Sequence, residues 1–281
     1  MLSRKPDIQP ENGPLVWSIV PEFSLTYNGY SVVIPYVEHY LNNIMQEVRQ
    51  KYCQDNPRLQ HEIDIFIHQE ALHSQFHTRF NRRMHESGFG ALTPLVTLIK
   101  EELKIQRETR SLAFNIAYCA GFESISTYVA KYLYTQCDEF FHNASPPGAN
   151  LLLWHVAEEF EHRAVCHDAF QQVSGNYFTR IHGLLWAFCH VGSRFMQAEK
   201  IVLNEYRKNM SPTQRKQSVR QSRKLFWRQL RYVAPRMLRI MLPWYNPSKL
   251  APPPRISAAL AFYQATGPID NMPDFTQTPR T

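Results

Sequence analysis

The chain has 281 residues, of which 44% are hydrophobic and 20% charged, and its formal net charge is +7. This length can bury a full core as one large domain, with or without an extension. No window reaches the roughly 18 uninterrupted apolar residues of a membrane span, and no apolar run follows the basic residues near the N-terminus, so we expect neither a membrane span nor a secretory signal. We therefore expect a cytoplasmic protein.

Helical patterning dominates the chain, and the alternation typical of strands is almost absent. An irregular arm over residues 1–24 comes first. Apolar residues at helical spacing then predict helices over residues 31–52, 58–86, 101–141, 149–173 and 177–206. Pro35 is expected in the first turns of the first helix, where its missing N–H costs little. The pattern predicts an all-α fold with four long helices followed by further helices.

Two of these predicted helices carry Glu and His three residues apart, namely Glu70 with His73 and Glu159 with His162. Side chains at this spacing share one face of a helix. The motif is short and arises by chance. A third pair, Glu139 and His142, lies at a polar helix end just before a Pro-Pro-Gly turn, and we expect it to play no part in a metal site.

The other two helices each carry a lone carboxylate among apolar or small residues, Glu38 and Glu123. The order is therefore one Glu, Glu-x-x-His, one Glu, Glu-x-x-His on four successive helices. This is the ligand set of ferritin-like di-iron and di-manganese carboxylate bundles. It predicts a ferritin-like four-helix bundle over residues 25–202 that holds two iron ions, with manganese or zinc as alternatives.

A structural explanation competes with metal binding for any one of these side chains. A buried Glu can pair with Arg, and a lone core His is often structural. The structural explanation fails for all six together, because uncompensated buried charge costs several kcal/mol and the surrounding stripes offer few cations. In the predicted centre Glu70 and Glu159 bridge the ions, and Glu38 and Glu123 are terminal ligands.

The stretch W-H-V-A-E-E-F-E-H at residues 154–162 resembles the signature of a bacterial family described as predicted metal-dependent hydrolases, over about residues 15–245. A more distant resemblance is to the di-iron arylamine N-oxygenases, which add one histidine four residues before the last ligand glutamate. His155 holds this position relative to Glu159. The resemblance implies that His155 is a seventh ligand, and a second-shell or core histidine is the alternative.

Neighbouring ionisable side chains are expected outside the ligand set. His77 lies one turn beyond His73, and we expect it to contact a ligand or the substrate rather than a metal. Glu158, Glu161 and Asp168 are expected to point away from the ligands and to pair with neighbours such as Arg163.

The predicted activity is that of a di-iron, dioxygen-dependent oxidase or oxygenase, which needs an electron donor and a small organic substrate. Two alternatives stay open. A di-metal hydrolase would activate water at the same site, and a non-catalytic protein would only bind metal. Small residues around Glu123 either leave space for dioxygen or let helices approach closely; they are Ala120, Gly121, Ser124, Ser126 and Thr127.

Residues 203–256 form a basic segment. Between residues 203 and 240 there are 11 Lys or Arg and one acidic residue, a net of +10, so the rest of the +7 chain carries −3. Interleaved apolar residues predict a basic amphipathic helical extension, which suits an anionic membrane surface, here the inner membrane, and a lipophilic substrate. A solvated face whose apolar side caps the bundle is the alternative, and nucleic acid is disfavoured because no recognised binding module is present. A Pro-rich tail follows at residues 257–281.

Overall fold

The computed structural model describes residues 1–265, 267–275 and 277–280. The prediction of an all-α protein is confirmed, since the only β-type feature among these residues is an isolated bridge between Asp7 and Pro268. The helices are α1 (Pro21–Tyr52), α2 (Pro57–Glu86), α3 (Thr93–Thr109), α4 (Leu112–Gln136), α5 (Asp138–Phe141), α6 (Pro146–His162), α7 (Val165–Val173), α8 (Tyr177–Tyr206), α9 (Pro212–Met241) and α10 (Pro254–Tyr263). Short 3-10 helices cover Pro10–Asn12, Gly90–Leu92 and Pro247–Lys249.

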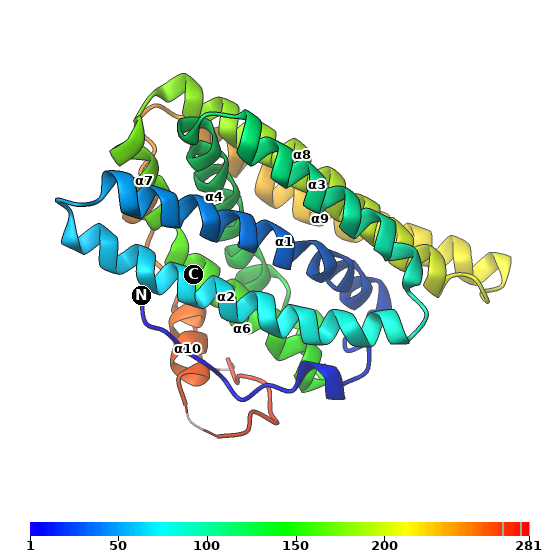
Figure 1. The fold of residues 1–281 in the computed structure, drawn as a ribbon. Coiled ribbons are helices and arrows are strands. Elements are labelled where there is room, and N and C mark those ends of the chain that lie inside the picture. Colours follow the sequence, from blue (N-terminus) through cyan, green and yellow to red (C-terminus); the bar gives the residue numbers. More distant parts are fainter. Residues whose placement is uncertain (266, 276, 281) are drawn as a thin grey trace.

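The long helices form a bundle around one main core. α1 and α2 lie side by side as an antiparallel pair, α8 packs against α1 and α4, and α6 and α7 pack against α4 (Figure 1). The N-terminal arm and α10 lie along the opposite side of the bundle from α8 (Figure 1). This arrangement is consistent with a ferritin-like bundle in which α1, α2, α4 and α6 carry the predicted ligands.

The first helix begins earlier than the sequence predicts. α1 starts at Pro21, whose fixed φ and missing N–H suit a first helical position. Pro35 therefore lies inside the helix, and the expectation that it sits in the first turns is wrong. The periodic apolar side chains extend upstream to Phe23 and Leu25, which are both buried.

Two predicted helices are each divided. The predicted helix over residues 101–141 is interrupted after α3, where the Ser111 hydroxyl caps α4 by accepting from the Phe114 N–H at 3.3 Å. The predicted helix over residues 149–173 breaks at Arg163 and Ala164, between α6 and α7. At Arg163 the apolar pattern continues across the break, so periodicity alone does not reveal it, whereas residues 106–111 read Q-R-E-T-R-S and contain no apolar residue.

α4 and α8 approach each other closely at Gly121. A Cβ on Gly121 would lie 2.6 Å from the Cα of Leu184, which is closer than packed atoms tolerate. A Cβ on Gly183 would likewise lie 2.4 Å from the carbonyl carbon of Ala117. Of the two explanations for the small residues near Glu123, close helix approach is the one that Gly121 supports.

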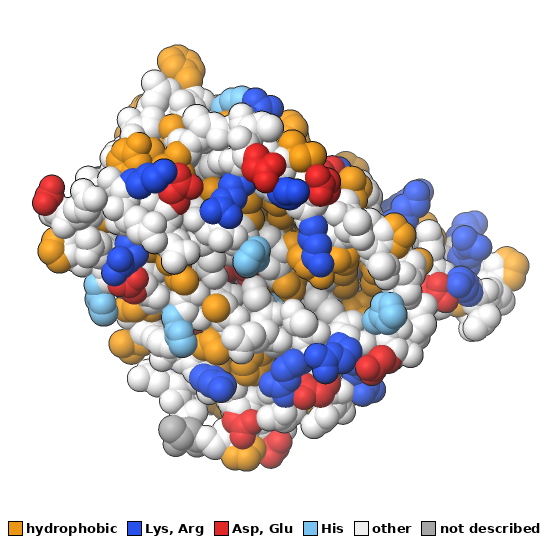
Figure 2. Space-filling model, viewed as in Figure 1, with side chains coloured by type: hydrophobic (Ala, Val, Ile, Leu, Met, Phe, Trp, Pro, Cys, Tyr) orange, Lys and Arg blue, Asp and Glu red, His pale blue; other side chains and the backbone are white. Residues whose placement is uncertain are grey.

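The C-terminal part contains the expected basic helix. α9 covers residues 212–241, and α8 runs through the predicted boundary at residue 203. Lys and Arg side chains gather over the end of the molecule where α8 and α9 meet (Figure 2). The tail predicted at residues 257–281 begins within α10, whose Tyr263 is 1% exposed, and its residues 266, 276 and 281 lie outside the described part. Among the described residues, no helix is both long and apolar enough to cross a bilayer.

Candidate metal centre

Four helices bring the seven predicted ligands to one buried place. α1 contributes Glu38, α2 contributes Glu70 and His73, α4 contributes Glu123, and α6 contributes the remaining three. The i, i+4 and i+7 spacing of His155, Glu159 and His162 keeps all three on one face of α6. All seven side chains lie in the interior, and His155 is the most exposed of them at 4%.

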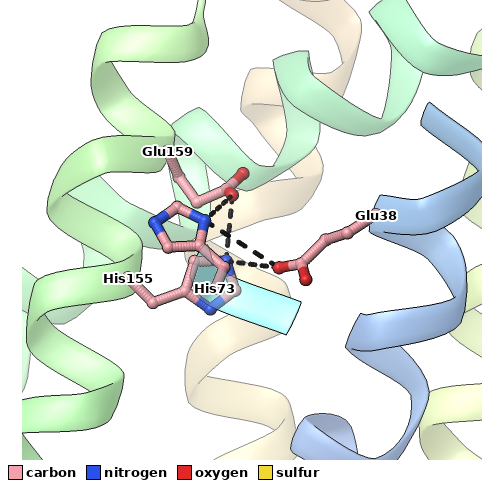
Figure 3. Close-up of side chains that lie close together, drawn as sticks. All are labelled: Glu38, His73, His155 and Glu159. Carbon is pink, nitrogen blue, oxygen red and sulfur yellow. Dashed lines mark hydrogen bonds and ion pairs between the residues drawn. The ribbon is translucent and has the colours of Figure 1, made fainter. Parts of the chain in front are cut away.

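The donor atoms form two groups that share Glu159. The first group comprises Glu38, His73, His155 and Glu159, whose side chains point toward one another from α1, α2 and α6 (Figure 3). In it, His155 Nε2 lies 2.9 Å from Glu159 Oε1 and 3.4 Å from Glu38 Oε1. His73 Nδ1 lies 3.9 Å from Glu38 Oε1 and 4.0 Å from Glu159 Oε1.

The second group comprises Glu70, Glu159 and His162, with Glu123 close by. His162 Nδ1 lies 2.8 Å from Glu70 Oε1, 3.8 Å from Glu159 Oε1 and 3.8 Å from Glu123 Oε2. Glu70 Oε1 also lies 3.6 Å from His73 Nδ1, so it stands between the histidines of the two groups. Glu70 and Glu159 therefore occupy the positions from which a carboxylate can bridge two ions.

Most inward-facing atoms of this cluster lack hydrogen bonds, the exception being the 2.9 Å contact between His155 Nε2 and Glu159 Oε1. The buried atoms without a hydrogen-bond partner include Glu38 Oε1, both carboxylate oxygens of Glu70 and of Glu123, Glu159 Oε2, His73 Nδ1 and His162 Nδ1. Buried polar atoms in native proteins are almost always satisfied, because an unsatisfied one costs about 1–3 kcal/mol. Such a concentration of unsatisfied acceptors around one point is expected where a cation belongs.

The pKa values of the cluster show the same lack of compensation. Burial, reinforced by neighbouring carboxylates, raises the pKa of both Glu38 and Glu123 well above the usual range. Burial would also raise the pKa of Glu70, but the adjacent His162 and His73 outweigh it and lower that pKa. Burial disfavours a charged imidazole, yet carboxylate neighbours raise the pKa of His73 and His162.

Two ligand histidines are oriented from outside by hydrogen bonds. His73 Nε2 lies 2.9 Å from Glu158 Oε2, and His162 Nε2 lies 3.1 Å from Gln69 Oε1. Because both partners are acceptors, each Nε2 carries a proton, and each Nδ1 is the nitrogen that would present a lone pair to a bound ion. Glu38 is held likewise, since its Oε2 accepts from the Ser74 hydroxyl at 2.6 Å while Oε1 faces inward. Hydrogen bonds of this kind fix metal ligands and tune their basicity.

The third histidine is oriented through a chain of side chains. His155 Nδ1 lies 2.6 Å from His77 Nε2, and His77 Nδ1 lies 2.7 Å from the Ser31 hydroxyl. Ser31 in turn donates to Asn81 Oδ1 at 2.8 Å. Since the Ser31 proton is committed to Asn81, His77 Nδ1–H donates to Ser31, and His77 Nε2 accepts from His155 Nδ1–H. His155 Nε2 is then the nitrogen that faces Glu38 and Glu159, where a bound ion would replace the proton of its 2.9 Å contact with Glu159 Oε1. His77 contacts a ligand rather than the centre itself.

The expected surroundings of Glu158 and Glu161 need correction. Glu158 is fully buried, and both carboxylates pair with Arg4 of the N-terminal arm, whose Nη1 lies 3.2 Å from Glu158 Oε1 and 2.7 Å from Glu161 Oε2. Arg163 instead donates to the carbonyls of Phe160 and Leu250. The expected pairing with Arg163 is therefore wrong for these two glutamates.

Asp168 also lies outside the ligand set. It is half-buried on α7, and burial, together with the charge of Glu62, raises its pKa. The charge of Arg58 of α2 lowers it, and among the described residues no ion pair joins Asp168 to Arg163.

Sequence reasoning missed the residues that support the ligands. Arg4 lies more than 150 positions from its partner on α6, and Gln69 joins His162 to the N-terminal arm through a 3.0 Å bond to the Leu2 carbonyl. Ser31 and Ser74 are ordinary helical serines in the sequence. No periodicity marks these residues, because each acts through a contact between separate helices or between a helix and the arm.

The third Glu-x-x-His pair lies away from the centre, as expected. Glu139 belongs to the short helix α5, where it is exposed and pairs with Arg228 of α9. His142 follows the end of α5. The same spacing thus gives a surface ion pair here and donor sites in α2 and α6.

The donor set fits two divalent cations. The four carboxylates Glu38, Glu70, Glu123 and Glu159 carry a charge of −4 when ionised, which two divalent ions balance. Mixed imidazole and carboxylate donors suit iron, manganese or zinc. Glu158 does not disturb this balance because it is paired with Arg4.

A helical bundle around such a centre defines a candidate two-metal bundle protein. The family model described as "Predicted metal-dependent hydrolase" matches residues 3–251. The chain belongs to this family, and the resemblance carried by residues 154–162 is confirmed. Searches of curated proteins and of solved structures found no match.

Proposed function

We propose that this protein is a two-metal enzyme and that its reaction is the dioxygen-dependent oxidation of a small organic substrate by a di-iron centre. The observation that carries the proposal is the convergence of four carboxylates and three imidazoles on one buried point where eight of their donor atoms lack hydrogen bonds. One ion would be held by Glu38, His73 and His155, the other by Glu123 and His162, and both would share Glu70 and Glu159.

The character of the donors favours iron and oxidation. When bound, two irons supply the electrons that reduce dioxygen and the oxidising power that acts on a substrate. Four anionic ligands neutralise two divalent ions, which weakens their ability to acidify water and stabilises a higher oxidation state. Imidazole and carboxylate together suit iron.

The enclosure of the centre also favours a small reactant. Every proposed ligand is at most 4% exposed. None of the ligands lines either of two surface pockets, one between α1, α2 and α3 and one beside the N-terminal arm. Dioxygen needs less space to reach such a centre than a substrate with a hydrolysable bond and its attacking water.

One of these pockets is connected to the centre by hydrogen bonds. Its wall includes Asn81, which is joined to His155 through Ser31 and His77. The other lining side chains include Val32, Tyr36 and Phe89, which suit an organic molecule with apolar groups. We propose this pocket as the binding site of the organic substrate, connected to the ligand His155 through Asn81, Ser31 and His77.

Hydrolysis is the second candidate, because the description of the family names it. Two bound divalent ions can supply a nucleophilic water and stabilise an oxyanion. In that case the chain of His77, Ser31 and Asn81 would hold His155 in its ligand tautomer in the same way. The two candidates differ in the metal and in the need for dioxygen.

The test compares iron with redox-inert ions in the full-length protein. Metal-free protein is titrated with ferrous iron under anaerobic conditions and then mixed with dioxygen, while absorbance and dioxygen consumption are followed. We expect about two irons per chain and a transient absorbance that iron-free protein lacks. Zinc-loaded protein is assayed in parallel on esters, amides and phosphoesters without dioxygen. Hydrolysis there, with no response of the iron form to dioxygen, would replace oxidation by hydrolysis.

A further inference from the structure

The outward face of α9 is basic and carries exposed apolar side chains. The helix contains nine Lys or Arg and no Asp or Glu. Its inward side chains, which include Leu225, Val233 and Ile240, are buried against the bundle. The outward face and the residues that follow it are called the α9 surface below and comprise Arg220, Arg223, Lys224, Trp227, Arg231, Leu238, Leu242 and Trp244, all exposed.

Helical geometry places five of these side chains on one stripe. Arg220, Lys224, Trp227, Arg231 and Leu238 follow one another at spacings of four, three, four and seven, which keeps them within one face of a helix. The stripe is anchored at its C-terminal end, where Arg180 of α8 donates to the carbonyls of Ile240 and Leu242 at 2.6 and 2.7 Å. The face is therefore held in position by both the core and α8.

The cations of the α9 surface have no carboxylate partners. Among the described residues, the ion pair formed by α9 joins Arg228 to Glu139, and no pair involves Arg220, Arg223, Lys224 or Arg231. If this basic face served only solubility, we would expect the apolar side chains beside it to be buried. Here Trp244 is 75% exposed, Leu238 67% and Trp227 52%.

We propose that the α9 surface binds the surface of an anionic lipid bilayer, with its cations at the headgroups and its Trp and Leu side chains at the headgroup–acyl boundary. Basic amphipathic helices with exposed Trp and Leu bind membranes in this orientation, and Trp favours the interface because one end of its ring is polar. Complementary charge supplies the attraction, since each Lys or Arg near an anionic surface contributes favourably.

Two other partners fit the surface less well. A second copy of the chain docked through the same face would oppose like charges across a twofold axis. Nucleic acid would use the cations, but it offers no apolar environment for Leu238 and Leu242. The exposed apolar side chains thus decide in favour of lipid, and the inference does not depend on the reaction at the metal centre.

The experiment uses the full-length protein with extruded vesicles of phosphatidylcholine, with and without one-third phosphatidylglycerol. We expect co-sedimentation with the anionic vesicles only, weakening as salt is raised. The double variant Arg223→Gln/Arg231→Gln should bind the anionic vesicles about 25-fold more weakly, at about fivefold for each lost cation. The matched control Lys51→Gln/Arg58→Gln removes the same charge at the turn between α1 and α2 and should change binding by less than about twofold.

Tryptophan emission tests the insertion of the apolar side chains. Binding to anionic vesicles should shift the emission to shorter wavelength, and Trp227→Phe/Trp244→Phe should keep the binding and lose the shift. Absence of binding at low salt, or equal weakening in the control variant, would overturn the proposal. Binding of a single-stranded oligonucleotide through Arg223 and Arg231, without binding of vesicles, would also overturn it. Circular dichroism checks that every variant is folded.

Discussion

The buried centre and the α9 surface are both rich in charge of one sign, yet they differ in what that charge requires. In the centre, carboxylates are removed from water and their inward oxygens have no hydrogen bonds, so burial itself demands a cation. On the α9 surface the cations are exposed, and water satisfies them without a carboxylate partner among the described residues. In the first region, the burial of the carboxylates indicates a bound cation. In the second region, the exposed apolar side chains beside the cations indicate a partner.

The largest expected effect contrasts a buried ion pair with a surface one. Arg4→Met removes the partner of the buried Glu158 and should lower the free energy of unfolding by about 3–5 kcal/mol. Arg228→Met breaks the more exposed pair with Glu139 and should lower it by at most about 1 kcal/mol. Urea unfolding of both variants measures the difference, and equal effects would contradict the contrast between the two regions.

A ligand substitution should have opposite effects with and without metal. Glu123→Gln removes a buried carboxylate whose oxygens lack partners, so we expect the metal-free variant to be about 1–3 kcal/mol more stable than metal-free wild type. The same variant should bind less metal. Thermal unfolding with a chelator tests the expected gain in stability, and thermal unfolding with metal tests the expected loss of metal binding. A less stable metal-free variant would show that Glu123 is a structural residue.

Loss of His77 should weaken metal binding without removing a ligand. His77→Ala leaves His155 Nδ1 without its acceptor and should lower the affinity for metal about 10–100-fold. His85, on the same helix and exposed, provides the control, and His85→Ala should leave the affinity unchanged. Competition with a chromophoric chelator measures both, and an unchanged affinity in His77→Ala would contradict the orienting role.

A dependence on pH is also expected. In the metal-free centre the pKa values of Glu38, Glu123, His73 and His162 are raised, so the folded protein holds protons that the unfolded chain has lost. Stability of the metal-free protein should then fall as pH rises above about 7.5, by about 1.4 kcal/mol per unit for each such proton. Metal binding displaces these protons and should strengthen over the same range. Urea unfolding and chelator competition at several pH values measure the two slopes, and slopes of the same sign would contradict this account.

Much of the fold could be predicted from the sequence, because helical periodicity is a local signal. The helix over residues 177–206 was predicted with the bounds that α8 has, and the second helix differs by one residue at its start. The helix prediction does not include the interruptions at Ser111 and Arg163, since a local capping or turning event produces each of them. α1 starts ten residues before the predicted helix, because Phe23 lies within the predicted irregular arm and yet belongs to the buried face of α1.

The ligand positions followed from spacing, whereas their surroundings did not. The structure brings Glu38, Glu123 and the two Glu-x-x-His pairs together, and their role as ligands stays a prediction until metal is measured. Arg4 and the serine partners depend on contacts between distant segments, which no local pattern encodes. Spacing shows that Glu158 leaves the ligand face of α6. It does not show that Glu158 contacts His73 Nε2, on the side of the ring that points away from the centre.

The most direct test of the two-metal centre is the metal content of purified protein after ferrous loading, determined by elemental analysis. The centre predicts about two ions per chain in the wild type and in Glu139→Ala, and less than one in Glu159→Ala, because Glu159 belongs to both donor groups. Retention of about two ions in Glu159→Ala, or no bound metal in the wild type, would contradict the assignment of a two-metal centre to this cluster.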